Sequence, residues 1–156
     1  MKISGEIKVK ANRAAVFDAL CDARFFASCI DGVRELTQVD EKSYAAILET
    51  KVAYLQFKFK ITVQLVRVEP PSLIEAKIEG NPLGIVGHLA ATTVTTFAEA
   101  GNETVISYAM DMALTGKLGA VGQPVLKSKA REMEKQFTRN LEAAFESATP
   151  TPKDLQ

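Results

Sequence analysis

The hydrophobic positions of this chain repeat with two different periods. Residues 3–9 alternate between apolar and polar side chains, which predicts a half-buried strand. Asn12 and Asp22 each precede a short apolar pattern with helical spacing, and both residue types are preferred N-caps. We therefore expect two short helices after the first strand, with Gly32 ending the second.

Between the second short helix and residue 114 the hydrophobic period is two, which is typical of strands. The segments that fit this period are 33–39, 43–52, 56–68, 73–79, 85–97 and 104–114. Short turns rich in Gly, Pro, Asn and Asp separate them. These connections are too short for crossover helices, so the strands must pair antiparallel.

After the last strand the period returns to 3.6 residues. An apolar stripe that includes Leu118, Val125, Met133 and Phe137 predicts one long amphipathic helix. A long helix in the concavity of a curved sheet would cover the apolar face of that sheet. The predicted fold is α+β and helix-grip: a seven-stranded curved antiparallel sheet around a long C-terminal helix, with two short helices after the first strand. A cavity commonly remains between sheet and helix.

Length and composition fit one globular domain. The chain has 156 residues, 47% of them hydrophobic, and we expect a single domain over 1–147 with a flexible tail over 148–156. Lys and Arg number 19, and so do Asp and Glu. Because no positive charge is in excess for phosphate contacts, we expect no nucleic-acid partner.

Few side chains offer catalytic or metal-binding chemistry. Two cysteines, Cys21 and Cys29, and one histidine, His88, are too few for a disulfide scaffold or a zinc site, so we expect no metal and no cofactor. The N-terminus lacks the apolar core of a signal peptide. The uncharged stretch 80–98 is too polar for a bilayer helix, so we expect a cytoplasmic protein without an integral membrane segment.

Several short motifs occur in a fixed order along the chain. They are Gly5, Val16 with Leu20, Cys29-Ile30-Asp31-Gly32, Pro70-Pro71, Gly80 with Gly84, Thr104 with Tyr108, and Gly116-Lys117-Leu118 with Gly122. Over residues 1–147 the chain thereby resembles the carbon monoxide dehydrogenase G-subunit (CoxG) family, which belongs to the START-like, polyketide-cyclase-like (SRPBCC) superfamily. The family usually has proline where this chain has Asp31, and it usually lacks a proline at the position of Pro124.

The resemblance implies a non-catalytic accessory protein. The family is associated with membrane attachment of a molybdenum-containing carbon monoxide dehydrogenase, or with carrying a quinone-type lipid to it. The implied partners are an apolar small molecule, such as a quinone or another lipid, and a molybdenum hydroxylase complex. A peripheral location at the inner face of the membrane is compatible with both roles.

Apolar and aromatic residues on the predicted inner face are the candidate lining of a ligand cavity. The inner-face candidates are Tyr44, Leu48, Phe57, Phe59, Ile61, Ile78, Tyr108, Met110 and Met112. His88 and two residues near the helix start, Leu118 and Val121, complete the candidate lining. Methionine adapts to varied apolar ligands, and tyrosine adds a polar tip. Each of these side chains would serve equally well as ordinary core, so both interpretations stay open.

Three glycines precede the long helix. Gly116, Gly119 and Gly122 recur every third residue before Pro124, and each glycine inside a helix costs about 1 kcal/mol relative to alanine. This weak segment is either a gate at the cavity mouth or a close approach of backbone to sheet, with the helix beginning near Pro124.

Two other functions remain open. The first is a small helix-grip enzyme of the cyclase or hydratase type that uses His88 and a tyrosine, although the alternation in 85–97 leaves the face of His88 ambiguous. The second is an assembly or interaction factor without a ligand. A cavity below about 300 Å³ would favour the interaction factor, and two converging titratable groups would favour the enzyme.

Overall fold

The computed structural model describes residues 1–148, with side chains through residue 146. In chain order its elements are β1 (Lys2–Val9), α1 (Arg13–Cys21), α2 (Ala23–Ser28), β2 (Val33–Asp40), β3 (Ser43–Val52), β4 (Leu55–Glu69), β5 (Leu73–Pro82), β6 (Gly87–Ala100), β7 (Glu103–Gly116), the 3-10 helix η1 (Gly119–Val121) and α3 (Gln123–Ala148). Apart from Ala148, the predicted tail lies outside the described residues. The domain boundary at residue 147 stays a prediction.

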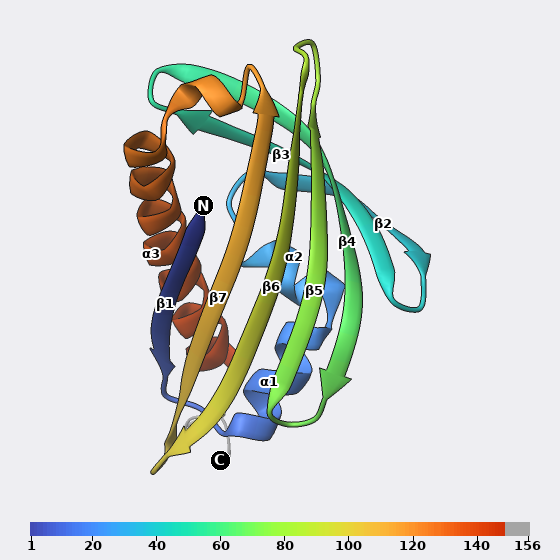
Figure 1. Cartoon of the computed structure of the whole chain (residues 1–156). Coiled ribbons are helices and arrows are strands. Elements are labelled where there is room, and N and C mark those ends of the chain that lie inside the picture. Colours follow the sequence, from blue (N-terminus) through green and yellow to red (C-terminus); the bar gives the residue numbers. More distant parts are fainter. Residues whose placement is uncertain (149–156) are drawn as a thin grey trace.

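The strands form one curved antiparallel sheet in the order β1-β7-β6-β5-β4-β3-β2. Strands that follow one another in the chain pair from β2 to β7, and β1 pairs with β7 and forms one edge of the sheet. Figure 1 shows α3 running beside β1, with α1 at the lower end of the sheet and α2 closer to its middle. The predicted α+β helix-grip fold is confirmed, and the strand bounds agree with the sequence pattern to within a few residues.

Local hydrogen bonds start the two short helices where the sequence predicts. The Asn12 side chain accepts from the backbone N–H of Ala14 at 2.9 Å, and Asp22 accepts from that of Arg24 at 2.9 Å. Gly32 follows α2 with φ +91°, and a Cβ there would collide with the backbone carbonyl oxygen of Glu49. Glycine is therefore required at this turn for both conformation and space.

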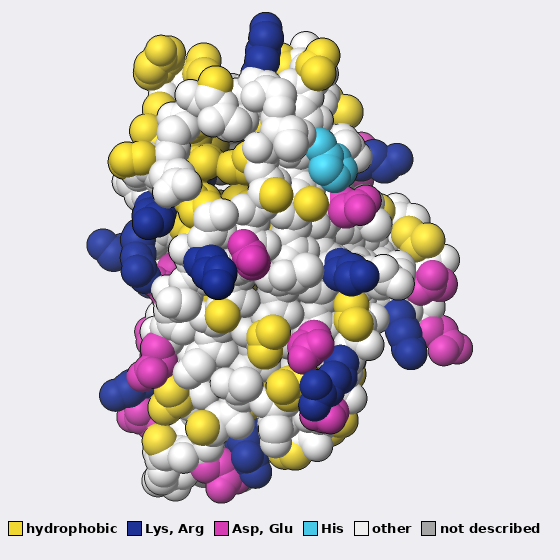
Figure 2. Space-filling view, viewed as in Figure 1, with side chains coloured by type: hydrophobic (Ala, Val, Ile, Leu, Met, Phe, Trp, Pro, Cys, Tyr) yellow, Lys and Arg dark blue, Asp and Glu magenta, His cyan; other side chains and the backbone are white. Residues whose placement is uncertain are grey.

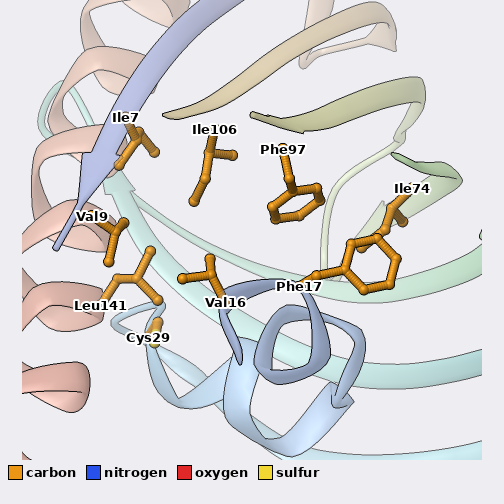
Figure 3. Close-up of a cluster of buried hydrophobic side chains, with 9 residues drawn as sticks. All are labelled: Ile7, Val9, Val16, Phe17, Cys29, Ile74, Phe97, Ile106 and Leu141. Carbon is orange, nitrogen blue, oxygen red and sulfur yellow. The ribbon is translucent and has the colours of Figure 1, made fainter. Parts of the chain in front are cut away.

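Apolar side chains from α1, α3 and the sheet form one core at the lower end of the molecule, drawn in Figure 3 and here called the lower core. Its buried members are Ile7, Val9, Val16, Phe17, Cys29, Ile74, Phe97, Ile106 and Leu141. The rings of Phe17 and Phe97 meet edge to face at 5.0 Å, which joins α1 to β6. The short helices therefore close this end of the sheet.

A second cluster, the upper core, lies at the opposite end of the sheet. Its buried members are Val52, Phe57, Phe59 and Leu118. Leu118 lies just before η1, so this core joins the β3–β4 hairpin to the connection between β7 and α3. Val121 and Val125 pack against it from η1 and α3.

The long helix begins later than its apolar stripe predicts. Leu118 and Val121 belong to the turn before α3 and not to the helix, because Gly122 takes φ +96° and interrupts the spiral. The alternative that the helix begins near Pro124 is confirmed, since α3 starts at Gln123. Pro124 is tolerated there because the first N–H groups of a helix have no partner within the helix.

One polar contact ties the middle of α3 to the sheet. The Tyr108 hydroxyl on β7 donates to Glu134 Oε1 on α3 at 2.9 Å. Gly5 on β1 pairs with Tyr108, and a Cβ at Gly5 would lie 2.6 Å from the Tyr108 hydroxyl oxygen and collide with the Glu134 carboxylate. The missing side chain at Gly5 therefore makes room for this hydrogen bond.

Gly5→Ala should consequently destabilise the protein by about 1–3 kcal/mol, the usual cost of overpacking. Urea unfolding of the variant measures this loss. In a background that carries both Tyr108→Ala and Glu134→Ala the same substitution should cost clearly less, because both groups that the new Cβ meets are gone. An equal cost in both backgrounds would contradict the collision as its cause.

Candidate ligand-binding site

The middle of the concave face, between the two cores, is loosely packed. Strand pairing places Tyr44, Val63, Ile78, Ala91 and Met112 in one row across the sheet. Ala91 is buried, but the other four remain half-buried although they point to the same side as the core residues. Large apolar side chains that face inward and still meet solvent indicate a hollow between sheet and helix.

A pocket of about 280 Å³ opens beside this row. It is lined by Met1, Met112, Ala113, Leu114, Gly119, Gln123 and Leu126, which come from β7, η1, the start of α3 and the N-terminus. Figure 2 shows hydrophobic side chains at the base of a recess in this part of the surface. Met112 belongs both to the row and to the pocket, so the pocket borders one end of the row.

The predicted lining residues fall into distinct groups. Those buried in the upper core are Phe57, Phe59 and Leu118. Those packed against that core are Leu48, Ile61 and Val121. Those half-buried on the concave face are Tyr44, Ile78, Tyr108, Met110 and Met112. Only this last group is placed to border the hollow.

The expectation that His88 lines the cavity is wrong. His88 pairs with Thr115, while its neighbour Leu89 pairs with Leu114 and packs against the upper core. Successive strand residues point to opposite faces, so His88 lies on the convex face. Its Nδ1 is 2.8 Å from Oδ1 of Asn81, and Figure 2 shows the ring on the outer surface.

Tyr108 supplies a polar group whose proton is already in use. Its hydroxyl donates to Glu134, whose second oxygen lies 3.5 Å from Nη1 of Arg131. Burial, together with the hydrogen bond to the carboxylate, raises the pKa of Tyr108 to about 12. As long as this bond is intact, Tyr108 can accept a hydrogen bond from a ligand but cannot donate one.

Tyr44 is the second inward-facing tyrosine, near the α1–α2 end of the hollow. Burial raises its pKa to about 12, with a smaller contribution from the nearby Cys21. Burial also raises the pKa of the Cys21 and Cys29 thiols, so neither is an activated nucleophile. Among the described residues, no group of His, Cys, Asp and Glu could hold a metal ion.

Of the three predicted gate residues, only Gly119 lines the pocket, and the other two lie at the ends of the same turn. Gly116 ends β7 with φ +65°, where a Cβ would lie 2.6 Å from the carbonyl oxygen of Val86. Gly119 lines the pocket, and Gly122 has open space around it but φ +96°. Close packing therefore explains Gly116, and backbone conformation explains Gly122.

Sequence reasoning missed several residues of the site. Leu114, Gln123 and Leu126 line the pocket, and the apolar period marked Leu114 only as a strand residue. Glu134 lies next to the apolar stripe of the helix, and no sequence pattern indicates that it accepts a hydrogen bond from Tyr108. Lys129 on α3 has a side chain only 14% exposed and reaches Glu132 at 3.0 Å, so its stem covers apolar surface.

A family model supplies the identification. The model of the carbon monoxide dehydrogenase G subunit (CoxG) matches residues 5–146, nearly the whole described chain. The chain belongs to the CoxG family. No curated protein sequence matches this CoxG-family chain significantly.

Solved structures confirm the START-like fold of this CoxG-family chain. A conserved protein from Geobacillus kaustophilus gives a TM-score of 0.87 at 21% identity, covering 95% of this chain and 97% of that protein. A START superfamily protein from Mycobacterium smegmatis gives 0.73 at 11% identity, with 95% and 99% covered. A Chromobacterium violaceum protein gives 0.68 at 14% identity, with 92% and 95% covered. At such identities the likeness establishes the fold alone.

Within the described residues, no helix combines the length and the apolar character needed to cross a membrane.

The raised pKa values predict a late phenol titration. Tyrosine ionises near pH 10 in an unfolded chain, so Tyr44 and Tyr108 hold their protons more tightly when folded, and stability should fall as pH rises from about 10 through about 12. Tyrosinate absorbance should show both phenols ionising near pH 12. Tyr44→Phe and Tyr108→Phe should each remove one of these two late ionisations. Ionisation of either phenol near pH 10, while circular dichroism still reports the fold, would contradict the assignment.

Proposed function

We propose that this CoxG-family chain binds an apolar small molecule, a quinone or another lipid, between its sheet and α3 without converting it. The observation that carries the proposal is the half-buried row Tyr44, Val63, Ile78 and Met112 with a pocket opening onto it. Ligand sites are concave and mostly apolar, with few polar groups to orient the ligand. This inner face meets that description, with Tyr108 and Tyr44 as its polar groups.

The proposed protein partner is inferred from the family name and not from the geometry of the pocket. The family name points to carbon monoxide dehydrogenase, and we propose a molybdenum-containing enzyme of that kind as the recipient of the bound molecule. A cytoplasmic protein that attaches reversibly to the inner face of the membrane would have access to both lipid and enzyme. The CoxG-family chain would then act as an accessory carrier.

The residues that the alternative enzymatic function requires lie on opposite faces of the sheet. It requires His88 and a tyrosine to act on one ligand, but His88 lies on the convex face and Tyr44 and Tyr108 lie on the concave face. The backbone of the sheet separates these groups. No general base from the sequence analysis therefore faces the hollow.

An assembly factor is the second candidate, and the pocket volume favours it. The pocket measures about 280 Å³, slightly below the roughly 300 Å³ at which small-molecule sites begin. To be enclosed, a long apolar ligand would have to pass Met112 and extend between the sheet and α3. Ligand binding must therefore be measured directly.

The chain has no tryptophan, so a single introduced one reports on a chosen site. Gln123→Trp at the pocket rim should show saturable fluorescence quenching by a short-tailed menaquinone analogue, reversed by oleate. Val94→Trp, on the exposed convex face, should not. Mass spectrometry should recover the quinone unchanged.

In the Gln123→Trp reporter, Met112→Glu should weaken quinone binding at least tenfold, about 1.4 kcal/mol. Val94→Glu adds the same charge outside, and His88→Ala alters the outer face. Both should keep the affinity within a few-fold. If no apolar probe binds saturably to the reporter or the parent chain, the carrier function is excluded and the assembly role stands.

The turn between β7 and α3 is the proposed gate for ligand entry. It joins two positive-φ glycines, Gly116 and Gly122, through a single 3-10 turn that lines the pocket. Short segments with few internal hydrogen bonds open at low free-energy cost. Residues 115–124 should therefore exchange amide hydrogens faster than residues 128–144 and slow down when the quinone analogue binds.

Gly119→Ala is the variant that tests the gate. Its φ is not positive, and its new Cβ would lie 3.1 Å from the carbonyl oxygen of Leu114, so only a small shift is needed. Ligand entry and exit should slow with little change in affinity. Gly122→Ala is unsuitable because φ +96° strains any alanine. Uniform protection across both segments, with unchanged ligand rates, would leave glycine packing as the explanation.

A further inference from the structure

An apolar strip lies between the sheet and α3, from the pocket to the hydrogen bond between Tyr108 and Glu134. On β1 and its partner β7 every second side chain faces the concave side, and on α3 every fourth residue returns to nearly the same side. Figure 1 shows α3 and β1 side by side here. The outer, middle and inner tiers of the strip are Met1, Met112 and Leu126, then Ile3, Met110 and Ala130, and then Gly5, Tyr108 and Glu134.

Contacts fix both ends of the apolar strip. The outer tier lines the pocket, and in the inner tier the Tyr108 hydroxyl donates to Glu134 Oε1 at 2.9 Å. All three side chains of the middle tier are apolar and only half-buried. Tyr108 precedes Met112 by four strand residues, which is about 13 Å. An apolar molecule of that length, entering from the pocket, would bring its leading end to the hydrogen-bonded pair.

The inner tier presents hydrogen-bond acceptors. A phenol has one proton and two lone pairs, and the Tyr108 proton is already given to Glu134 Oε1. The other carboxylate oxygen, Oε2, lies 3.5 Å from Nη1 of Arg131. Arg131 reaches it from the surface, since its side chain is 62% exposed and also donates to the Ser4 carbonyl oxygen at 3.4 Å. A molecule in the apolar strip therefore meets the lone pairs of Tyr108 and has to supply the proton of a hydrogen bond.

The charge at this pair favours a neutral donor over a cation. The Glu134 side chain is only 17% exposed, and the Arg131 guanidinium already supplies the opposite charge beside it. An ammonium group would have to leave water and pass two apolar tiers, which costs far more free energy than moving a hydroxyl group. A hydroxyl also gains from the chain of hydrogen bonds, because a Tyr108 that donates to a carboxylate is a stronger acceptor. The inner tier therefore suits a neutral hydroxyl.

We propose that the polar end of the bound molecule is a phenolic hydroxyl, as in a reduced quinol, and that it donates to the Tyr108 oxygen. This inference rests on the proposed function, because it specifies which form of an apolar ligand the same site selects. The carbonyl oxygen of an oxidised quinone would face a Tyr108 lone pair without a donor, and a polar group left unpaired away from water is unfavourable. The chain would therefore bind the quinol more tightly than the quinone, with the apolar tail towards the pocket.

The test compares three forms of one probe by equilibrium dialysis against the full chain. The forms are the short-tailed menaquinone analogue, its quinol kept reduced with dithionite in the absence of oxygen, and the dimethyl ether of that quinol. Only the quinol carries a hydroxyl donor, while the ether keeps the reduced ring without one. The quinol should bind at least tenfold more tightly than either the quinone or the ether, and both of these should still bind saturably.

Two substitutions at the pair should change this preference in different ways. Tyr108→Phe removes the acceptor, so the preference for the quinol over the quinone should fall to threefold or less. Glu134→Gln keeps the shape of the side chain, but its amide can donate to Tyr108 and free the phenol proton for a ligand carbonyl. The quinone should then bind more tightly than it binds the parent chain, a gain that loss of a structural contact would not produce. Tyr54→Phe makes the matched change at a side chain that is 84% exposed on the β3–β4 turn, and it should keep the parent preference.

The outcomes separate this inference from the proposed function. Saturable binding of all three forms with equal affinity would overturn the preference for the quinol and leave the carrier function intact. A preference that survives Tyr108→Phe, or that is lost in Tyr44→Phe instead, would place the ligand hydroxyl elsewhere and overturn the role of Tyr108. If Tyr108→Phe does not fold, Glu134→Gln decides alone, and an unchanged preference in that variant overturns the inference. If none of the three forms binds, the carrier function is excluded together with this inference.

Discussion

One helix has to cover the concave face of seven strands, and it is too narrow to do so. Seven strands about 4.8 Å apart make a sheet about 29 Å wide, whereas a helix with its side chains is about 10–12 Å across. The 26 residues of α3 extend about 39 Å and therefore cover the length of the face but not its width. The chain compensates at the two ends, with α1 and α2 over the lower core and the β3–β4 hairpin with η1 over the upper core. The middle is covered less completely, which is why Tyr44, Val63, Ile78 and Met112 stay half-buried there.

Specific polar contacts hold the helix across that hollow. Tyr108 binds Glu134 where the missing side chain of Gly5 leaves room, and further along α3 the Asn140 side chain donates to the carbonyl oxygen of Cys29 at 2.9 Å and to Asp31 at 3.1 Å. Asp31 thus has a partner on α3 where the resembled family usually has a proline. The helix is attached near its middle and towards its C-terminal end by hydrogen bonds, while its start is packed against the upper core by apolar contacts. A ligand entering at the start of α3 would disturb apolar packing and leave the hydrogen bonds intact.

The two ends of the sheet differ in chemistry as well as in packing. The lower end is closed by helices over the lower core and carries acidic turns, while Val39, Val66 and Val68 are exposed near those turns. The upper end has lysines, exposed Tyr54 and Val86, and a pocket lined by Gly119, two residues after Lys117. The proposed function uses this asymmetry, since the pocket for an apolar ligand lies towards the end that the short helices do not cover.

The sequence by itself determined the elements and most of the inner face. Period-two alternation identified the strands, Asn12 and Asp22 marked the helix starts, and Phe57 and Ile106 pointed inward as expected, because these signals depend on residues near one another in the chain. Only the tertiary structure decided whether an inward residue is core or lining, since Phe59 and Met112 share a face but only Phe59 lies against Leu118 and the upper core. It also decided the face of His88, where the local pattern was ambiguous and pairing with β7 supplied the register. The contact between Glu134 and Tyr108 joins residues 26 positions apart, and the upper core joins the β3–β4 hairpin to the turn before α3. No local period carries such information, because strand order and helix placement alone bring those residues together.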